Sequence, residues 1–290
     1  MAVRLLVIGK NSFIGKNIRL YSKFDTIDFI SLREVKPENI PFFNYDVVIF
    51  LAAIVHQSKR IPDAEYFRVN SDLAFETALL AKEHGIKQFI YLSTIKVYGS
   101  KSDHRIRTEN SPCFPDDAYG KSKYQAELRI KPLNDEHFTV SIIRTPIVYG
   151  EGVKANMLKL VHLVDKFPIL PLGNLHNKRN ITFVGNLVGF LDRIIELRSP
   201  GVFIAMDEEA VSTSQLVHYI AKALNKKARL LKIPVFIIKA GQKIFPGIFN
   251  KLFGSLEFDN SMSKAALGFK APYSVQSGIK IMVEAYKNNK

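Results

Sequence analysis

The N-terminal residues place a glycine-rich turn between an apolar strand and a helix. Residues 2–8 are apolar except for Arg4, which predicts a buried strand. Gly9, Ser12 and Gly15 follow with the spacing G-x-x-G-x-x-G, with Ser in place of the second glycine. Glycines permit a tight turn, and a helix start favours an anion. With a negative φ, Ser12 would keep a free N–H. The stretch therefore predicts a phosphate cradle in an α/β fold.

Apolar runs and helical patterns alternate beyond this turn. We expect strands at 29–32, 46–53, 89–93 and 142–150, and helices at 66–83 and from Tyr119 onward. This alternation across residues 1–150 predicts a parallel sheet with right-handed crossovers. Four further helices are expected at 156–165, 186–197, 214–224 and 276–286. Short strands and Pro/Gly turns between them are typical of a smaller mixed lobe that closes over a cleft.

Residues at the ends of two expected strands suit a dinucleotide. Arg33 follows the strand at 29–32, where an acidic residue would take the ribose hydroxyls and an Arg can meet a 2′-phosphate. Arg33 favours NADP on this reasoning, with a solvated Arg as the alternative. Ala52 and Ala53 end the next strand and are small enough for the chain to pass close to a flat cofactor. The lone His56 could reach the same place, but a structural role is the more common one for such a residue.

Thr94, Tyr119 and Lys123 carry the groups for proton transfer. Thr94 stands at the carboxyl end of the strand at 89–93, while Tyr119 and Lys123 are four residues apart on one helix face. An ammonium beside a phenol favours the phenolate and lowers the Tyr pKa from about 10. We therefore expect Tyr119 to act as proton donor and acceptor, with Thr94 donating to the same substrate oxygen.

Composition limits the class of partner and the compartment. A chain of 290 residues can bury one large α/β core or two lobes. The net charge of +14 suggests a polyanionic partner, but the basic residues are dispersed and form no nucleic-acid motif, so nucleic acid is excluded. The single Cys113, expected as a small loop side chain, rules out an internal disulfide and fits a reducing cytoplasm. No apolar stretch is long enough to span a membrane.

Residues 230–253 form an apolar, basic stretch with two interpretations. It contains Phe236, Ile237 and Phe245 among lysines, so it could lie on the inner membrane surface. It could equally be an internal helix pair broken at Pro246, which is the interpretation that we favour.

At this point the chain resembles the extended short-chain dehydrogenases/reductases, the NAD-dependent epimerase/dehydratase family, over nearly its whole length. The residues that carry the resemblance are the Gly9/Gly15 turn with Phe13 and Ile14, residues 46–53, Asn70, Ser93-Thr94 with Val97-Tyr98-Gly99, Tyr119/Lys123, and residues 144–150. The resemblance implies a Rossmann-type doubly wound sheet, with Thr94, Tyr119 and Lys123 as catalytic residues and no metal. The cofactor, NADP or NAD, would lie on Gly9, Ser12, Phe13, Ile14, Gly15, Arg33, Leu51, Ala52, Ala53, Asn70, Lys123 and Pro146.

The resemblance also implies a division of the chain. Residues 1–150 would bind NAD(P), and 181–206 would return to that domain. Residues 151–180 and 207–290 would form a mixed α/β lobe for a nucleotide sugar. Thr94, Ile95, Lys96, Asn156 and Arg179 would contact the substrate, with the Arg179 guanidinium forking onto the UDP phosphates.

A closer likeness is carried by 93–97, 152–157, 171–173 and 177–187. These segments are similar to bacterial C4-reductases of UDP-4-keto-6-deoxy-N-acetylhexosamines, which make surface-polysaccharide precursors and of which many relatives are called UDP-glucose 4-epimerases. Ser12 and a shortened segment after the second strand depart from the family pattern. The 4,6-dehydratases that the chain resembles carry an acidic pair after the catalytic Thr, where this chain has Ile95 and Lys96, so dehydration is not expected.

Three functions remain open from the sequence. The first is reduction of a UDP-4-keto sugar, and the second is a 4-epimerase that retains NAD and uses the same three residues. The third is a non-catalytic Rossmann protein that senses a dinucleotide, although such proteins typically lose the Tyr or the Lys. A homodimer is also expected.

Overall fold

The computed structural model describes residues 2–55, 61–99, 105–173, 175, 177–232, 234, 243–244 and 254–289 of the chain. His56 lies outside the described residues, as does most of the stretch 230–253, so neither interpretation of that stretch is tested.

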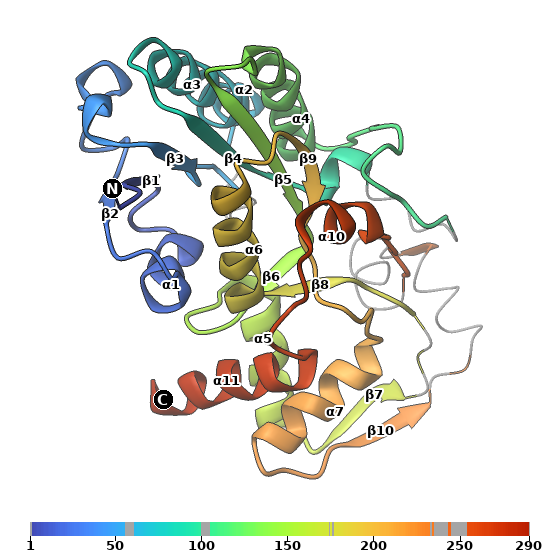
Figure 1. Ribbon diagram of the computed structural model, residues 1–290. Coiled ribbons are helices and arrows are strands. Elements are labelled where there is room, and N and C mark those ends of the chain that lie inside the picture. Colours follow the sequence, from blue (N-terminus) through green and yellow to red (C-terminus); the bar gives the residue numbers. More distant parts are fainter. Residues whose placement is uncertain are drawn as a thin grey trace.

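A six-stranded parallel sheet forms the centre of the molecule (Figure 1). Its order is β2-β1-β3-β4-β5-β9, and its strands are β1 (Leu5–Ile8), β2 (Ile27–Ile30), β3 (Val47–Phe50), β4 (Gln88–Thr94), β5 (Thr139–Thr145) and β9 (Gly201–Ile204). The inner strands are buried along nearly their whole length because helices cover both faces, and β1 and β3 are entirely apolar. The predicted doubly wound α/β fold is confirmed. The order reverses beside β1, where open α/β sheets bind ligands at the carboxyl ends of the strands.

Helices cover the sheet on two sides. One side carries α1 (Phe13–Tyr21) and α6 (Val184–Leu197), which bury an apolar cluster with β1 and β3. The other side carries α3 (Leu73–Glu83) and α4 (Ala118–Ile130), where small alanines let the helices approach the strands.

The helix predicted at 66–83 is divided in the structure. It begins as α2 (Asp63–Phe67), widens into a π-helical turn, η3 (Arg68–Asp72), and continues as α3. Such widened turns are rare overall, and those that occur are often located at functional sites. This one contains Asn70. Short 3₁₀ turns occur elsewhere, at η1 (Pro37–Asn39), η2 (Phe42–Asn44), η4 (Ile95–Tyr98) and η5 (Lys131–Leu133).

A second apolar cluster lies below the sheet in the view of Figure 1. It is built by α5 (Ala155–Lys166), α7 (Thr213–Ala223), α11 (Val275–Asn288) and two small parallel sheets. These sheets pair β6 (Ile147–Tyr149) with β8 (Ile181–Phe183), and β7 (Ile169–Gly173) with β10 (Arg229–Lys232). The helices predicted at 156–165, 186–197, 214–224 and 276–286 each occur within two residues of the expected bounds. The sequence did not predict α10 (Ser261–Leu267).

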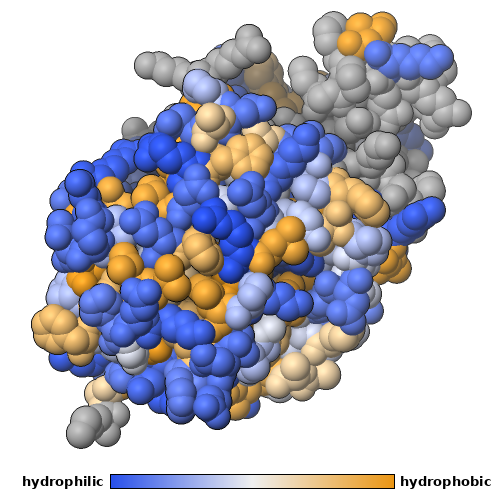
Figure 2. Space-filling model, turned by 90° about the horizontal axis from the view of Figure 1, so that it is seen from above, coloured by the Kyte–Doolittle hydropathy of each residue, from blue (hydrophilic) through white to orange (hydrophobic). Residues whose placement is uncertain are grey.

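The surface carries hydrophilic residues between smaller apolar groups, as Figure 2 shows for the upper face. No helix in the described ranges is long and apolar enough to cross a membrane.

Candidate functional site

The glycine-rich turn joins β1 to α1 as predicted. A Cβ on Gly15 would lie 2.7 Å from the Gly9 carbonyl oxygen, so only glycine fits there. Gly9 has φ +130° and packs against Leu51 and Ala52, where its missing side chain lets the turn approach β3. The first turn of α1 presents the N–H groups of a helix start, which favour a phosphate.

Ser12 caps α1 rather than donating outward. Its φ is −71°, as expected, and its hydroxyl accepts from the Gly15 N–H at 2.9 Å. Its own N–H donates to the Gly9 carbonyl at 2.8 Å, so the prediction of a free N–H at Ser12 is wrong. The tight turn itself consumes that donor. An anion would therefore meet the N–H groups of Phe13 and Ile14 at the start of α1.

The residue that follows β2 at the expected cofactor site is exposed to solvent. The loop that follows β3 is held in place by hydrogen bonds. β2 ends at Ile30, two residues earlier than expected, and Arg33 is exposed in the following turn, where its N–H donates to the Ser31 hydroxyl. Asn70 holds the loop after β3: its amide accepts from Ile54 N at 2.7 Å and donates to Ile54 O at 3.0 Å. It also donates to the Ser122 hydroxyl at 3.0 Å, so it fixes this loop to α4.

Thr94 and Tyr119 meet at the carboxyl end of β4. Thr94 is the last residue of that strand and pairs with Thr145 of β5, next to Pro146, which separates β5 from β6. Tyr119 is in the first turn of α4, and the Thr94 and Tyr119 side chains are hydrogen-bonded to each other. The two hydroxyls can therefore address one substrate oxygen.

A capped, close helix start positions Tyr119. Asp117 is the N-cap of α4 and accepts from Gly120 N at 2.7 Å, and it also pairs with Lys96. A Cβ on Gly120 would lie 2.8 Å from the Lys96 carbonyl, so glycine at this position lets α4 approach the residues after Thr94. Ile95, which precedes Lys96, is buried.

Lys123 is buried one turn further along α4, at 2% exposure. Its ammonium lies over the ring of Tyr91, 4.2 Å from the centroid. Burial lowers the Lys123 pKa to about 7, and the carboxylate of Glu127 opposes this shift.

The predicted lowering of the Tyr119 pKa is wrong. Burial raises this pKa to about 12, and the hydrogen bond from Thr94 only reduces the increase. Removing the phenol from water penalises the phenolate more than its neighbours stabilise it. Tyr119 is consequently protonated at neutral pH, which suits a proton donor.

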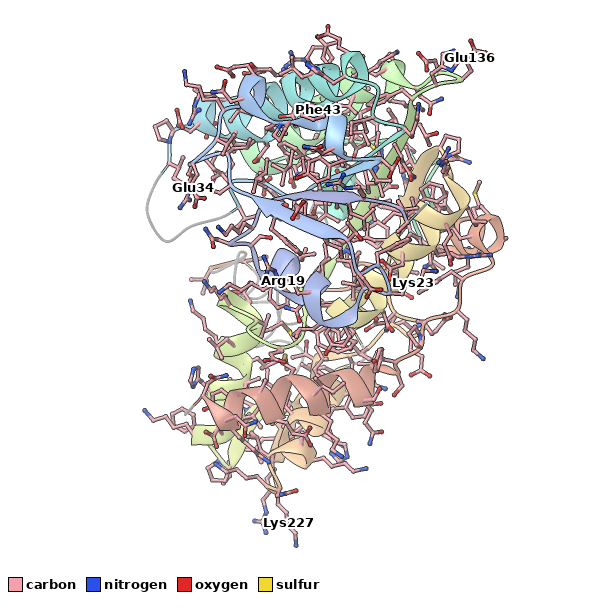
Figure 3. All side chains as sticks on the ribbon, turned by 60° about the vertical axis from the view of Figure 1, so that its left-hand side comes forward. Arg19, Lys23, Glu34, Phe43, Glu136 and Lys227 are labelled. Carbon is pink, nitrogen blue, oxygen red and sulfur yellow. The ribbon has the colours of Figure 1, made fainter. Side chains whose placement is uncertain are left out.

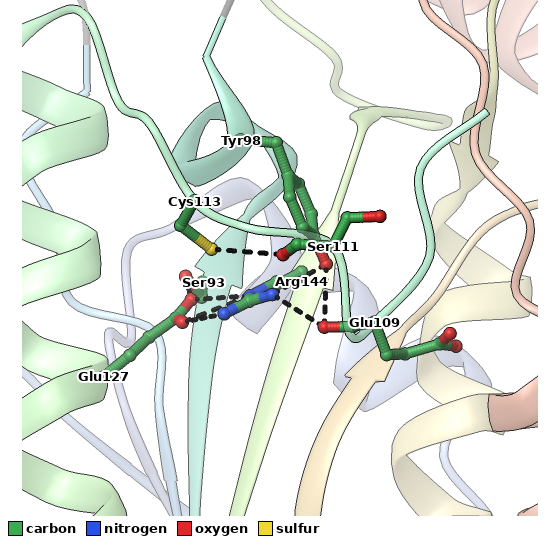
Figure 4. Close-up of polar contacts among 7 residues, drawn as sticks. All are labelled: Ser93, Tyr98, Glu109, Ser111, Cys113, Glu127 and Arg144. Carbon is green, nitrogen blue, oxygen red and sulfur yellow. Dashed lines mark hydrogen bonds and ion pairs between the residues drawn. The ribbon is translucent and has the colours of Figure 1, made fainter. Parts of the chain in front are cut away.

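The sequence did not reveal a buried ion pair behind these residues (Figure 4). Arg144 of β5 donates through Nε to both oxygens of Glu127 at 3.1 Å, and through Nη2 to one of them at 2.5 Å. Its Nη1 donates to the Tyr98 hydroxyl at 2.7 Å. Ser93, next to Thr94, donates to Glu127 as well. The available signals were Glu127 four residues after Lys123 and an Arg within an apolar strand.

Asn156 and Arg179, two of the predicted substrate residues, are distant in sequence from Thr94 and Tyr119. Asn156 is exposed at the second position of α5. Arg179 forms bridges with Val211 and Leu256, and its Nε donates to the Gly254 carbonyl at 2.9 Å. Burial lowers the Arg179 pKa.

A cleft of about 610 Å³ adjoins the glycine-rich turn. Asn11, Phe13 and Lys16 line one side, and α5 and α11 line the other. A second cavity, of about 370 Å³, is lined by Cys113, which is half-buried as expected of a loop side chain, and by Arg144. Neither cavity is lined by Thr94, Tyr119 or Lys123. In the described part of the chain no three His, Cys, Asp or Glu side chains gather as metal ligands.

Known proteins resemble the chain in sequence and in fold. It is 34% identical to a UDP-glucose 4-epimerase of Vibrio cholerae, over 99% of this chain and 96% of that protein. It is 27% identical, over 81% of this chain and 76% of the relative, to the N-acetyl-α-D-glucosaminyl-diphospho-ditrans,octacis-undecaprenol 4-epimerase of Escherichia coli O157:H7. The structure of MoeE5 in complex with UDP-glucose and NAD superposes with a TM-score of 0.76 at 19% identity, covering 99% of both chains, which shows the shared fold.

Residues 5–204 match the model of the NAD dependent epimerase/dehydratase family, which is most of the chain. The match includes the glycine-rich turn, Thr94, Tyr119 and Lys123. The chain therefore belongs to the NAD dependent epimerase/dehydratase family, as its sequence indicated.

Proposed function

We propose that this protein transfers hydride between a nicotinamide cofactor and C4 of a UDP-linked sugar. The observation that carries the proposal is the hydrogen-bonded pair of Thr94 and Tyr119 at the end of β4, with Lys123 one turn along α4. Two relatives that match most of the chain are named as 4-epimerases of sugar diphosphates, and a protein of the same fold was solved with UDP-glucose and NAD.

The chain's own residues handle the proton. The cofactor supplies or accepts the hydride. Tyr119, protonated at neutral pH, gives its proton to the C4 oxygen in the reductive direction, and Thr94 polarises that oxygen by donating a hydrogen bond. Lys123, which is buried, would hold the cofactor's ribose.

The fate of the 4-keto sugar separates two candidate functions. The first is reduction of a UDP-4-keto-6-deoxy-N-acetylhexosamine, favoured by the sequence segments at 93–97 and 177–187. The second is 4-epimerisation with retained NAD, favoured by the names of the two relatives. The protein should be incubated with UDP-4-keto-6-deoxy-GlcNAc and NADPH, and in parallel with UDP-glucose and UDP-GlcNAc. A stoichiometric fall in NADPH absorbance supports a reductase, and interconversion of 4-epimers without net cofactor consumption supports an epimerase. If the protein catalyses neither reaction, the result supports the third function, a non-catalytic protein that senses a dinucleotide.

We expect Arg33 to decide between the two cofactors. Its exposed side chain in the turn after β2 can meet a 2′-phosphate, so NADPH should bind about 10–150-fold more tightly than NADH, the range for a hydrogen bond to a charged group. Arg33→Ala should remove this preference, whereas Lys36→Ala, an exposed cation nearby, should keep it. If the parent protein binds NADPH and NADH equally tightly, Arg33 is a solvated side chain that does not contact the cofactor.

We expect Arg179 to hold the UDP diphosphate. Arg179→Ala should weaken UDP binding by about 1.5–3 kcal/mol and leave NAD(P)H binding intact, and Arg179→Lys should recover only part of the loss. Lys178→Ala is the matched control, because it removes the same charge from the exposed neighbour. Chemical unfolding of each variant must accompany the titration, since Arg179 also bonds Gly254. Unchanged UDP affinity in the Ala variant would place the phosphate site elsewhere.

Further expectations from the sequence stay predictions. Ala52, Ala53 and Pro146 would line the cofactor, and Ile95, Lys96 and Asn156 the sugar. Residues 151–180 and 207–290 would form the sugar lobe. A homodimer and contact of 230–253 with a membrane are likewise untested.

A further inference from the structure

The outer face of the small β7–β10 sheet is apolar at its centre. β7 and β10 pair in parallel with Ile169 opposite Arg229, so these two side chains share one face of the sheet. The opposite face is buried through Leu170 and Leu172 in the lower apolar cluster. On the outer face Ile169 is 51% exposed, and on the neighbouring strand Leu231, which lies where the register of β10 shifts, is 56% exposed.

The same region carries an excess of positive charge. Segments 166–171 and 226–232 contain five basic residues and no acidic one. All five are exposed: Lys166, Lys226, Lys227, Arg229 and Lys232. Asp165 borders the region and pairs with Lys226, so it offsets one of the five positive charges. Lys227 projects from the bottom of the molecule in Figure 3, far from Phe43 at the top.

Exposed apolar side chains flank the sheet as well. Phe167, 45% exposed, directly precedes β7, and the Lys166 ammonium lies 5.5 Å from its ring centroid. Aliphatic and aromatic groups surrounded by Lys and Arg match the boundary of an anionic lipid layer, where the apolar groups enter the acyl region and the cations remain among the headgroups. An acidic protein would pair with the cations, but the apolar side chains would need an additional apolar pocket on that protein.

We propose that this face, which we define as the outer side of β7 and β10 with Phe167 and Lys227, docks on an anionic phospholipid surface. The inference goes beyond the proposed function and does not depend on it. It uses only described residues and overlaps the stretch 230–253 only at residues 230–232, which belong to β10. Each basic residue close to an anionic surface strengthens attachment about fivefold.

Co-sedimentation of the full chain with vesicles tests the proposal. Vesicles of phosphatidylcholine with one third phosphatidylglycerol should carry the protein down, and vesicles of pure phosphatidylcholine or high salt should release most of it. The double variant Ile169→Ser/Leu231→Ser should bind the anionic vesicles at least about tenfold more weakly, because its apolar centre is lost. Phe43→Ser, which alters a 78% exposed aromatic at the other end of the molecule, is the matched control and should bind like the parent.

A charge pair gives an independent result if the double variant is poorly folded. Lys227→Glu/Lys232→Glu should also weaken binding at least about tenfold, whereas Lys36→Glu, at the exposed start of η1, should have a much smaller effect. Parent protein that stays in solution with anionic vesicles, or variants on this face that bind as tightly as the parent, would overturn the proposal. So would a dimer in solution that Ile169→Ser/Leu231→Ser dissociates, because a second copy would then cover the face. Activity on a UDP-sugar, measured without vesicles, tests the proposed function separately.

Discussion

Replacing Tyr119 by Phe is expected to lower kcat by about 10²–10⁴-fold, with little change in the binding of sugar or cofactor. The ring and its packing at the start of α4 are kept, and only the hydroxyl that hydrogen-bonds with Thr94 is lost. Single-turnover absorbance of the nicotinamide measures the chemical step directly, and equilibrium titration measures binding.

The matched control for this change is Tyr124→Phe on the same helix. Tyr124 is half-buried and lines the smaller cavity, which Thr94 does not line. It should retain the parent rate. A Tyr119→Phe variant with more than half of the parent rate would remove Tyr119 from the mechanism, whatever the reaction proves to be.

The pH dependence of the reductive step follows from the raised Tyr119 pKa. A donor with a pKa of about 12 stays protonated throughout the neutral range, so loss of its proton should not limit the rate below about pH 10. Lys123, with a pKa of about 7, loses its charge above neutrality. A fall in rate or cofactor affinity near pH 7 should therefore be assigned to Lys123, and Lys123→Arg should shift it upward.

Local patterns were sufficient to predict the sheet and the turn that opens it. Continuous apolar runs gave β1, β3 and β4 because helices bury both faces of these strands. The spacing of Gly9 and Gly15 predicted the turn because backbone contact excludes a Cβ at Gly15 regardless of what packs around it. Strand ends were less certain: β2 ends at Ile30 because a turn begins at Ser31, whose carbonyl accepts from the Glu34 and Val35 N–H groups.

Features that depend on distant parts of the chain could not be predicted in this way. The π-helical turn at 68–72 places Asn70 against the Ile54 backbone and Ser122, partners that are 16 and 52 residues away. The direction of the Tyr119 pKa shift depends on how completely the folded chain removes the phenol from water, which a four-residue spacing from Lys123 does not show. The same spacing correctly placed the two residues on successive turns of α4.

The buried pair of Arg144 and Glu127 leads to the largest expected effect on stability. Both side chains are nearly inaccessible, at 5% and 3% exposure, and each is the other's compensating charge. Arg144→Met should lower the free energy of unfolding by about 3–5 kcal/mol, because it leaves the Glu127 carboxylate buried without the guanidinium that bonds both of its oxygens. Urea unfolding followed by circular dichroism measures this loss. The matched control is Arg129→Met on α4, the helix that carries Glu127. It breaks the exposed ion pair with Asp72 of η3 and should lower the free energy of unfolding by no more than about 1 kcal/mol.

The double variant Arg144→Met/Glu127→Leu distinguishes the cost of a lone charge from the value of the pair. Removing both charges eliminates the buried carboxylate, so much of the stability lost in Arg144→Met should return, although Tyr98 still loses the donor that it had at 2.7 Å. A double variant as unstable as the single one would mean that the Arg144 bonds to Tyr98 and the Glu109 carbonyl, rather than charge compensation, hold this region together. Because Ser93 and Lys123 adjoin Glu127 on β4 and α4, the stable double variant should then be assayed for hydride transfer. A lower rate with normal stability would show that the carboxylate also maintains the charge of Lys123.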